Sequence, residues 1–152
     1  MIVLLDAGPL GLITNPNQNN VEAIQCQEWV WELVKKRVFV CVPEIAYYES
    51  RRKHVHLKNE KALKRLEDFV NHPRISYAPL TTEIIKKASD LWGWARSTGQ
   101  STAQENSIDS DVILAATAII MSLKPEHVVI ATTNVKHLAR YTLAQEWKQI
   151  TL

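Results

Sequence analysis

The sequence has few of the residues and motifs that mark secreted or membrane proteins. Only two cysteines, Cys26 and Cys41, occur in 152 residues, and they form no CxxC pair. We therefore expect two reduced core thiols in a cytoplasmic protein rather than a disulfide framework. No apolar run approaches the roughly 20 residues that a membrane helix needs. The amino terminus has no basic lead and no cleavage site, so we expect neither a membrane association nor a signal peptide.

Several motifs of common enzyme classes are also absent. The chain contains no GxGxxG, no Walker loop, no HExxH and no GxSxG. These absences argue against dinucleotide-binding, P-loop, zinc-protease and α/β-hydrolase sites. What is present is an ordinary globular composition, with 46% hydrophobic and 22% charged residues. A chain of this length and composition predicts one folded domain spanning residues 1–152.

Short apolar runs alternate with amphipathic stretches along the chain. The runs that predict strands are 2–5, 38–42, 75–78, 127–132 and 146–150. The stretches that predict helices are 21–36, 44–52, 58–71, 81–99 with their caps, 107–123 and a short segment from about 135. Buried strands alternating with helices are typical of a parallel sheet covered on both faces. The prediction is an α/β fold, a three-layer α/β/α arrangement around a central parallel sheet.

One carboxylate stands directly after a buried strand. Asp6 follows the apolar run at 2–5, where an uncompensated charge would cost several kcal/mol, about the penalty for an unpaired buried ion. Functional groups of parallel sheets collect at the carboxyl ends of the strands. Asn134 follows the run at 127–132 in the same way. Whether these two strand ends are neighbours is left open by the sequence.

Three further acids lie in apolar contexts at the ends of predicted elements. Asp109 stands where a helix dipole favours an acid. Asp111 begins a stripe of mostly small residues, at 111, 115, 118 and 122, that would let its helix lie close to the sheet. Glu49 has a plain alternative as a surface partner of Arg52 or Lys53. Asp6, Glu49 and Asp111 together are oxygen-only ligands, which predicts a site for Mg²⁺ or Mn²⁺.

Four segments resemble the motifs of PIN domains of the VapC-like type, the nuclease fold of many bacterial and archaeal toxin–antitoxin toxins. The segments are LLDAGPL (4–10), VPEIAYYESRR (42–52), DVILAATA (111–118) and VVIATTNVKHL (128–138). The third is the most specific, and the order and spacing of all four strengthen the resemblance. It covers nearly the whole chain.

The resemblance implies a metal-dependent ribonuclease with a PIN-like α/β/α fold. Asp6, Glu49 and Asp111 would bind the metal, and Asn134 would occupy the fourth position of the site. Asp109 and Thr132 would support these ligands. The implied cofactor is Mg²⁺ or Mn²⁺, the implied substrate is RNA, and the implied partners are an antitoxin and a second copy of the chain in the cytoplasm.

The chain departs from the family's pattern at Asn134, where the family usually has Asp. An amide keeps an oxygen ligand but loses a negative charge, so we expect weaker cation binding. Two alternatives stay open: a PIN-like scaffold that binds RNA or protein without cutting, and a small-ligand enzyme with Asp6 as its acid or base. Arg51, Arg52 and Lys53 are expected to guide RNA, although a solvated helix end explains them equally well.

Overall fold

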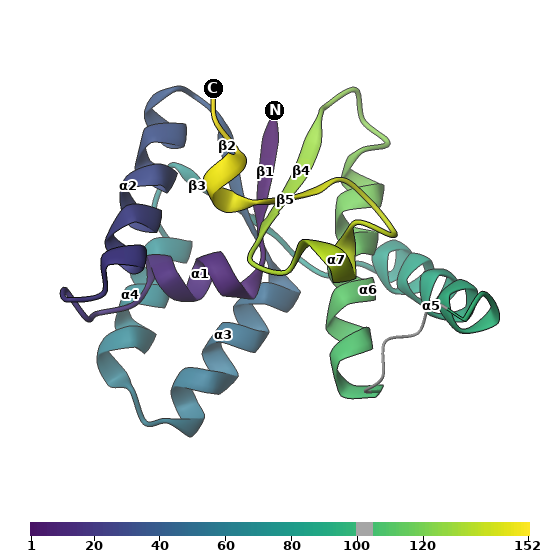
Figure 1. Ribbon diagram of the computed structural model, residues 1–152, viewed down its shortest axis with the longest axis horizontal. Coiled ribbons are helices and arrows are strands. Elements are labelled where there is room, and N and C mark those ends of the chain that lie inside the picture. The colour runs from purple at the N-terminus through teal and green to yellow at the C-terminus, as the bar shows by residue number, and fades with distance from the viewer. Residues whose placement is uncertain (100–104) are drawn as a thin grey trace.

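A computed structural model of the chain describes residues 1–99 and 105–152, with side chains for all of these except residues 105–109. The described residues form a five-stranded sheet in the order β3-β2-β1-β4-β5, and every neighbouring pair is parallel. The strands are β1 (Ile2–Leu5), β2 (Phe39–Pro43), β3 (Ile75–Ala78), β4 (Val128–Thr132) and β5 (Ala144–Glu146). Figure 1 shows the sheet between two groups of helices. The predicted three-layer α/β/α fold is confirmed.

The helices connect the strands and cover both faces of the sheet. They are α1 (Ala7–Ile13), α2 (Val21–Lys35), α3 (Glu44–His56), α4 (Glu60–Val70), α5 (Thr82–Ser97), α6 (Glu105–Met121) and α7 (Val135–Leu138). A short 3₁₀ helix, η1 (Trp147–Gln149), follows β5. In the described part of the chain, none of these helices has the length and apolar character needed to span a bilayer.

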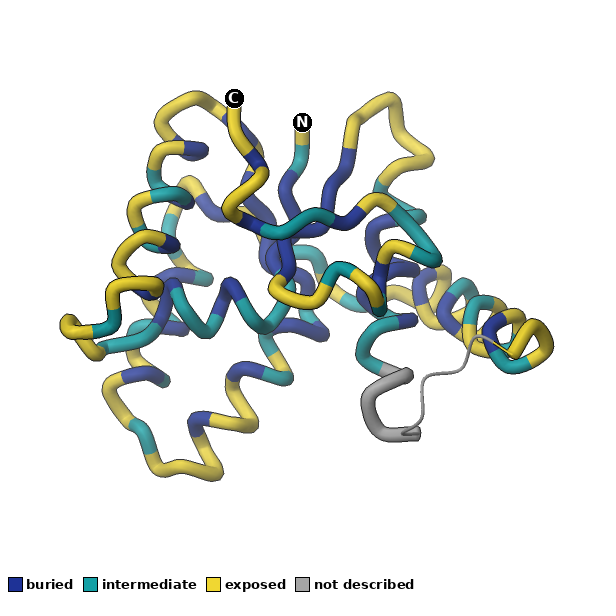
Figure 2. The backbone as a smooth tube through the Cα atoms, in the orientation of Figure 1, coloured by how far each residue is buried: buried dark blue, intermediate teal, exposed yellow. Residues whose placement is uncertain are grey.

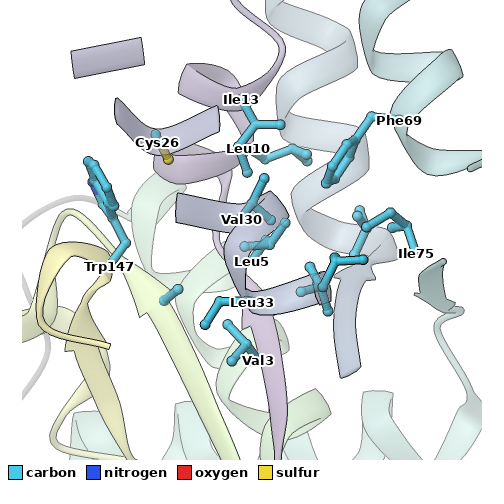
Figure 3. Close-up of a cluster of buried hydrophobic side chains, with 14 of the residues drawn as sticks. Val3, Leu5, Leu10, Ile13, Cys26, Val30, Leu33, Phe69, Ile75 and Trp147 are labelled. Carbon is cyan, nitrogen blue, oxygen red and sulfur yellow. The ribbon is translucent and has the colours of Figure 1, made fainter. Parts of the chain in front are cut away.

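Alternate residues of β1 face two separate hydrophobic cores. Val3 and Leu5 point toward the face covered by α1, α2 and α4, where they pack with residues such as Val30 and Leu66 (Figure 3). Leu4, between them, points to the opposite face and packs with Ala115 and with other residues of α6 and α7. Figure 2 shows the resulting dark band of buried chain through the sheet. Burial on both faces explains why the strands read as continuous apolar runs.

The small-residue stripe of α6 has the role that the sequence predicts. Ala115 and Ala118 are fully buried against the sheet, in the same core as Leu4 and Ile130. These small side chains, together with Leu114, fill the space between the helix and the strands. Asp111, at the amino-terminal end of this stripe, is thereby held near the sheet's edge.

The two cysteines are buried and unpaired, as expected. Cys26 lies in the core under α2 and Cys41 lies in β2. Burial is the largest effect on each thiol and raises the pKa of both to about 12. Neither thiol is therefore a reactive thiolate at neutral pH.

The structure contains one helix that the sequence did not predict, and one predicted strand lies elsewhere. Residues 7–13 form helix α1, although Gly8 and Pro9 suggest a turn; Asp6 caps this helix, and Pro9 stands in its first turn, where a missing N–H costs nothing. The last strand is 144–146 rather than 146–150, because the chain turns into η1 at Trp147 and buries that side chain in the core. Helix α3 also continues past Arg52 to His56.

The order of the strands determines where a site can form. From β1 the chain moves outward to β2 and β3 on one side, and later to β4 and β5 on the other. The direction of winding therefore reverses between β1 and β4. In open α/β sheets, the crevice outside the carboxyl ends of two such strands is where ligands bind.

Candidate active site

Asp6 lies in the crevice between the carboxyl ends of β1 and β4. Its backbone N–H donates to the Ala131 carbonyl at 3.0 Å, one residue beyond the end of β1. Its Oδ1 accepts a hydrogen bond from the Ala7 N–H at 2.7 Å and thereby caps α1. Its Oδ2 accepts a hydrogen bond from the Thr132 hydroxyl, also at 2.7 Å. The two strand ends, whose proximity the sequence leaves open, are thus in direct contact.

A glycine allows the start of α1 to approach the end of β4. A Cβ placed on Gly8 would lie 2.5 Å from the Thr133 Oγ1 and 3.2 Å from its Cγ2. Real Cβ atoms do not approach so closely, so any other residue at position 8 would require the Thr133 side chain or one of the two segments to shift. The hydrogen bond between Asp6 and Thr132 spans the same junction and depends on this close contact.

Glu49 reaches the same edge from α3, which packs against both α1 and α6. Burial, followed by the negative charge of Asp6, raises the pKa of Glu49 to about 7. The carboxylate of Asp111 contributes to the rise, whereas the Arg52 charge and a hydrogen bond with Ser110 oppose it. The charges of Asp6 and Asp111 therefore both disfavour the ionised form of Glu49.

Asp6 and Asp111 also have raised pKa values, and burial is the largest cause for both. Burial raises the pKa of Asp6, against the hydrogen bonds from Thr132 and Ala7, which lower it. Burial also raises the pKa of Asp111, followed by the charge of Asp6, while His137 and Arg140 lower it. Like charges held together out of water disfavour the ionised form. The three predicted acids therefore form one electrostatically coupled group at the carboxyl edge of the sheet.

His137 is a member of the site that the sequence alone did not reveal. Its Nδ1 lies 3.2 Å from the Asp111 Oδ2 and 3.2 Å from the Asn134 Nδ2. The imidazole of α7 therefore stands between the carboxylate of α6 and the amide that follows β4. Its spacing of three residues from Asn134 within a short helix was the available signal, but the contact with Asp111 depends on how α6 and α7 pack.

Asn134 is near the site but differs in placement from the three acids. Its backbone N–H donates to the Thr132 Oγ1 at 2.9 Å, so Thr132 links this residue to Asp6. Its side chain is exposed and contacts His137 rather than a carboxylate. The prediction that Thr132 supports the site is consistent with both hydrogen bonds. The predicted fourth position is thus occupied by an amide on the rim of the crevice.

The three basic residues after Glu49 have different surroundings. Arg52 lowers the pKa of Glu49, and its guanidinium carbon stands 5.2 Å from the centre of the Tyr48 ring. Lys53 is exposed and lines a groove beside the site. Arg51 instead lies near the Tyr47 hydroxyl and lowers its pKa, against the larger raising effect of Glu67. Two of the three therefore border the acidic crevice. The side chain of Asp109, which was predicted to support the site, lies outside the described residues.

A groove of about 550 Å³ leads away from Glu49 between α1 and α3. Its α3 side includes Glu49, Arg52 and Lys53, and its α1 side includes Gly8 and Gly11. The groove therefore begins at the acidic crevice and continues past two cations. An anionic polymer that lay along it would reach the carboxylates at one end.

Two solved structures are similar to this chain. A chain of the VapBC2 structure from Rickettsia felis, bound to a DNA fragment from its promoter, superimposes with a TM-score of 0.71. That match has 16% sequence identity and covers 95% of this chain and 98% of the other. A chain of VapBC-1 from nontypeable Haemophilus influenzae has a TM-score of 0.69 and 18% identity, covering 98% and 100% of the two chains. The chain has a PIN-like fold. No family model and no curated protein sequence matches it.

The PIN-like fold implies a divalent cation, and the donor set can be tested against that implication. Asp6, Glu49 and Asp111 offer only oxygen ligands, which suit Mg²⁺ or Mn²⁺. Burial raises all three pKa values, and neighbouring carboxylates raise those of Glu49 and Asp111 further, so a bound cation would stabilise the ionised group. Within the described ranges, no three His, Cys, Asp or Glu side chains are already arranged as a metal site. The donors fit such a cation in chemistry, and binding it requires them to draw closer together.

Proposed function

We propose that this protein is a metal-dependent endoribonuclease that hydrolyses RNA phosphodiester bonds. The observation that carries the proposal is the convergence of Asp6, Glu49 and Asp111, from β1, α3 and α6, on one crevice at the carboxyl edge of the sheet. Carboxyl groups with pKa values raised by burial and by one another are common at functional sites, which supports the proposal. The fold shared with two VapBC structures supports the same function.

Each side chain has a definite role in this proposal. Asp6, Glu49 and Asp111 would hold Mg²⁺ or Mn²⁺, which when bound supplies positive charge and lowers the pKa of water. The Ala7 amide and the Thr132 hydroxyl keep both oxygens of Asp6 in place. The pKa of Glu49 is about 7 without a cation, so cation binding at neutral pH would displace its proton.

The remaining polar residues orient the carboxylates and the substrate. His137 contacts Asp111 and keeps one of its oxygens directed toward α7. Arg52 and Lys53 would bind phosphates of the RNA as it enters along the groove. Asn134, on the rim, would contact the substrate or a water molecule rather than add charge to the site.

The proposed cellular role is that of the toxin in a type II toxin–antitoxin pair. Both similar structures are named VapBC, which supports a cognate antitoxin as the partner. A homodimer and a cytoplasmic location are part of the same proposal.

Cleavage of a mixed pool of structured RNA tests this function. Protein purified free of any partner would be incubated with Mn²⁺ or Mg²⁺, beside Asp6→Asn, Asp111→Asn and an EDTA control. We expect discrete cleavage by the parent protein that is lost in both variants and in EDTA. Cleavage that persists in Asp6→Asn would contradict the assignment, because it would come from another site or a contaminant.

A second candidate function is an RNA- or protein-binding scaffold with weak or no catalysis. Two observations favour it: the exposed amide of Asn134 adds no charge, and the described carboxylates are not pre-arranged as a metal site. This candidate predicts RNA binding in the absence of divalent cations and no cleavage in their presence. Restoring the family's usual acid with Asn134→Asp would then be expected to produce or raise activity.

A further inference from the structure

The floor of the groove between α1 and α3 contains two polar side chains that the proposed reaction does not use. Ser50 and His54 lie one helical turn apart on α3, and both line the groove. Ser50 is 5% exposed and His54 is 8% exposed. Neither the Ser50 Oγ nor the His54 Nε2 has a hydrogen-bond partner among the described residues. Both atoms are therefore buried, polar and unsatisfied.

Unsatisfied buried polar atoms reduce the stability of a folded protein, and native structures contain few of them. Two such atoms on successive turns of one helix, both belonging to residues of the same groove, call for a common explanation. Both residues line the groove while these two atoms are turned away from solvent, so a bound molecule would satisfy them once the side chains rotate toward it. The position of these atoms suggests that α3 carries them for a ligand rather than for the fold.

The walls and the mouth of the groove indicate the chemistry of that ligand. Its walls include the apolar side chains of Leu12, Pro16 and Leu57, and its mouth carries the cations of Arg52 and Lys53. The volume, about 550 Å³, falls within the range of about 300–1,000 Å³ that small-molecule sites occupy. Apolar walls suit the faces of a planar base, polar atoms suit its edge, and cations suit a phosphate.

We propose that this groove binds one nucleotide of the RNA substrate and that Ser50 and His54 recognise the edge of its base. The proposal rests on the proposed function, because the groove shares Glu49 with the candidate active site. The bound nucleotide would be the one beside the scissile phosphate. Single-stranded RNA is recognised in this way, by hydrogen bonds to the edges of unstacked bases. Ser50 and His54 would then determine base preference and take no part in the hydrolysis.

A glycine of α1 offers a direct way to block the groove. Gly11 lines it, and a Cβ placed there meets nothing within 4 Å. Gly11→Leu would start a side chain from this open position into the groove, and leucine is a better helix former than glycine. Gly93, in α5, likewise has open space where a Cβ would stand, and it does not line this groove. Gly93→Leu is therefore the matched control.

The first experiment measures binding of AMP, CMP, GMP and UMP separately, by NMR titration of the full chain in EDTA, so that no cleavage occurs. We expect at least one nucleotide to shift the resonances of α1 and α3. Its affinity should fall at least about tenfold in Gly11→Leu and stay within about twofold in Gly93→Leu. Equal affinity in both variants, or no binding of any nucleotide at millimolar concentration, would overturn the proposal. A groove that instead binds only a protein partner would be among the overturning results.

The second experiment asks whether the Ser50 hydroxyl serves a ligand or the fold. Ser50→Ala removes an unsatisfied hydroxyl, so it should raise the melting temperature and weaken the preferred nucleotide about threefold to tenfold, the loss of one hydrogen bond. Ser89→Ala, on exposed α5, corrects for helix propensity because the Ser89 hydroxyl bonds its own helix at the Ile85 carbonyl. A lower melting temperature than in the Ser89 control would show a structural role for Ser50 and contradict the proposal.

The two proposals can fail separately. Nucleotide binding that depends on Gly11 and Ser50, in a protein that cleaves no RNA with Mn²⁺, would support the groove and contradict the catalytic function. Metal-dependent cleavage whose base preference is the same in the parent, Ser50→Ala and His54→Gln proteins would support the catalytic function and overturn the groove.

Discussion

The two sides of the candidate active site hold their carboxylates differently. On the β1–β4 side, Asp6 is the cap of α1 and accepts hydrogen bonds at both oxygens, each at 2.7 Å, from the Ala7 amide and the Thr132 hydroxyl. On the α6–α7 side, one oxygen of Asp111 lies 3.2 Å from the Nδ1 of a half-exposed His137, and the charge of Arg140 also lowers the pKa of this carboxyl group. Asp6 is therefore fixed at both oxygens by residues at the ends of β1 and β4, whereas Asp111 is held by side chains near the surface.

This difference suggests how the site would assemble around a cation. Because Asp6 is fixed by β1, Thr132 and α1, it would move little. Asp111 and Glu49 lie on helices at the edge of the sheet and are half-buried, so they are the side chains that would adjust. Mutations of the residues around the two carboxylates should therefore have different effects. Those beside Asp6 should mainly change the free energy of unfolding, and those beside Asp111 should mainly change cation affinity.

The largest change in stability is expected for Thr132→Val. Valine keeps the shape of the fully buried side chain but removes the donor to Asp6 and the acceptor of the Asn134 N–H. We expect a loss of about 1–3 kcal/mol in the free energy of unfolding, measured by urea denaturation at pH 8. The loss should be smaller at pH 3, where Asp6 is protonated in both states. Thr117→Val, whose hydroxyl bonds its own helix, should cost less.

Gly8→Ala should give a smaller loss on the same side. The added Cβ would meet Thr133, and this overpacking of about 1–3 kcal/mol is offset in part by about 1 kcal/mol of helix propensity. Gly11→Ala, in the same helix and in open space, should gain stability instead. Thermal unfolding of the two variants beside the parent protein measures both effects. Equal stabilisation by the two alanines would contradict the close contact of α1 with β4.

The pH dependence of stability should report the carboxylate group as a whole. The pKa of Glu49 is raised from 4.5 to about 7, so between these values the folded state binds more protons than the unfolded state. In EDTA, this residue's contribution to stability should be greatest below pH 4.5 and fall as the pH rises toward 7. Denaturant titrations across this range should show a flatter profile in Glu49→Gln. An unchanged profile would mean that neither burial nor the charges of Asp6 and Asp111 raise the pKa of Glu49.

The smallest change in stability is expected for His137→Gln. The side chain is at the surface, so the free energy of unfolding should change by less than about 0.5 kcal/mol. Groups that orient a metal-binding carboxylate nevertheless affect cation affinity, and we expect Mn²⁺ binding to weaken about tenfold in calorimetry. His127→Gln, just before β4 at the other end of the strand, is the matched control. Equal Mn²⁺ affinity in the two variants would exclude a role for His137 at the site.

Much of the fold could be predicted because its signals are local. The apolar runs at 2–5 and 128–132 are long enough to be buried strands and too short for helices, and the helices between them have clear periodicity. Helix α1 was missed because Gly8 and Pro9 are turn residues in most contexts, and only the capping carboxylate of Asp6 shows that they begin a helix. Residues 146–150 were misplaced because burial of Trp147 in the core, a tertiary effect, ends the strand.

The site could be predicted only in part, because its geometry depends on the order of the strands. Asp6, Glu49 and Asp111 could be identified as acids at the ends of elements, and the structure groups them electrostatically. The contact between Asp6 and Thr132 requires β1 and β4 to be neighbours, which no local pattern specifies. The position of His137 requires the packing of α7 on α6, and the outward direction of Asn134 follows from the same turn.

Calorimetric titration with Mn²⁺ is the most direct test of a cation site formed jointly by the two sides. We expect a single binding site in the parent protein, and its loss in both Asp6→Asn and Asp111→Asn while each variant keeps its cooperative unfolding. Binding that survives in either folded variant, or is absent from the parent protein, would contradict the convergence of these carboxylates on one cation.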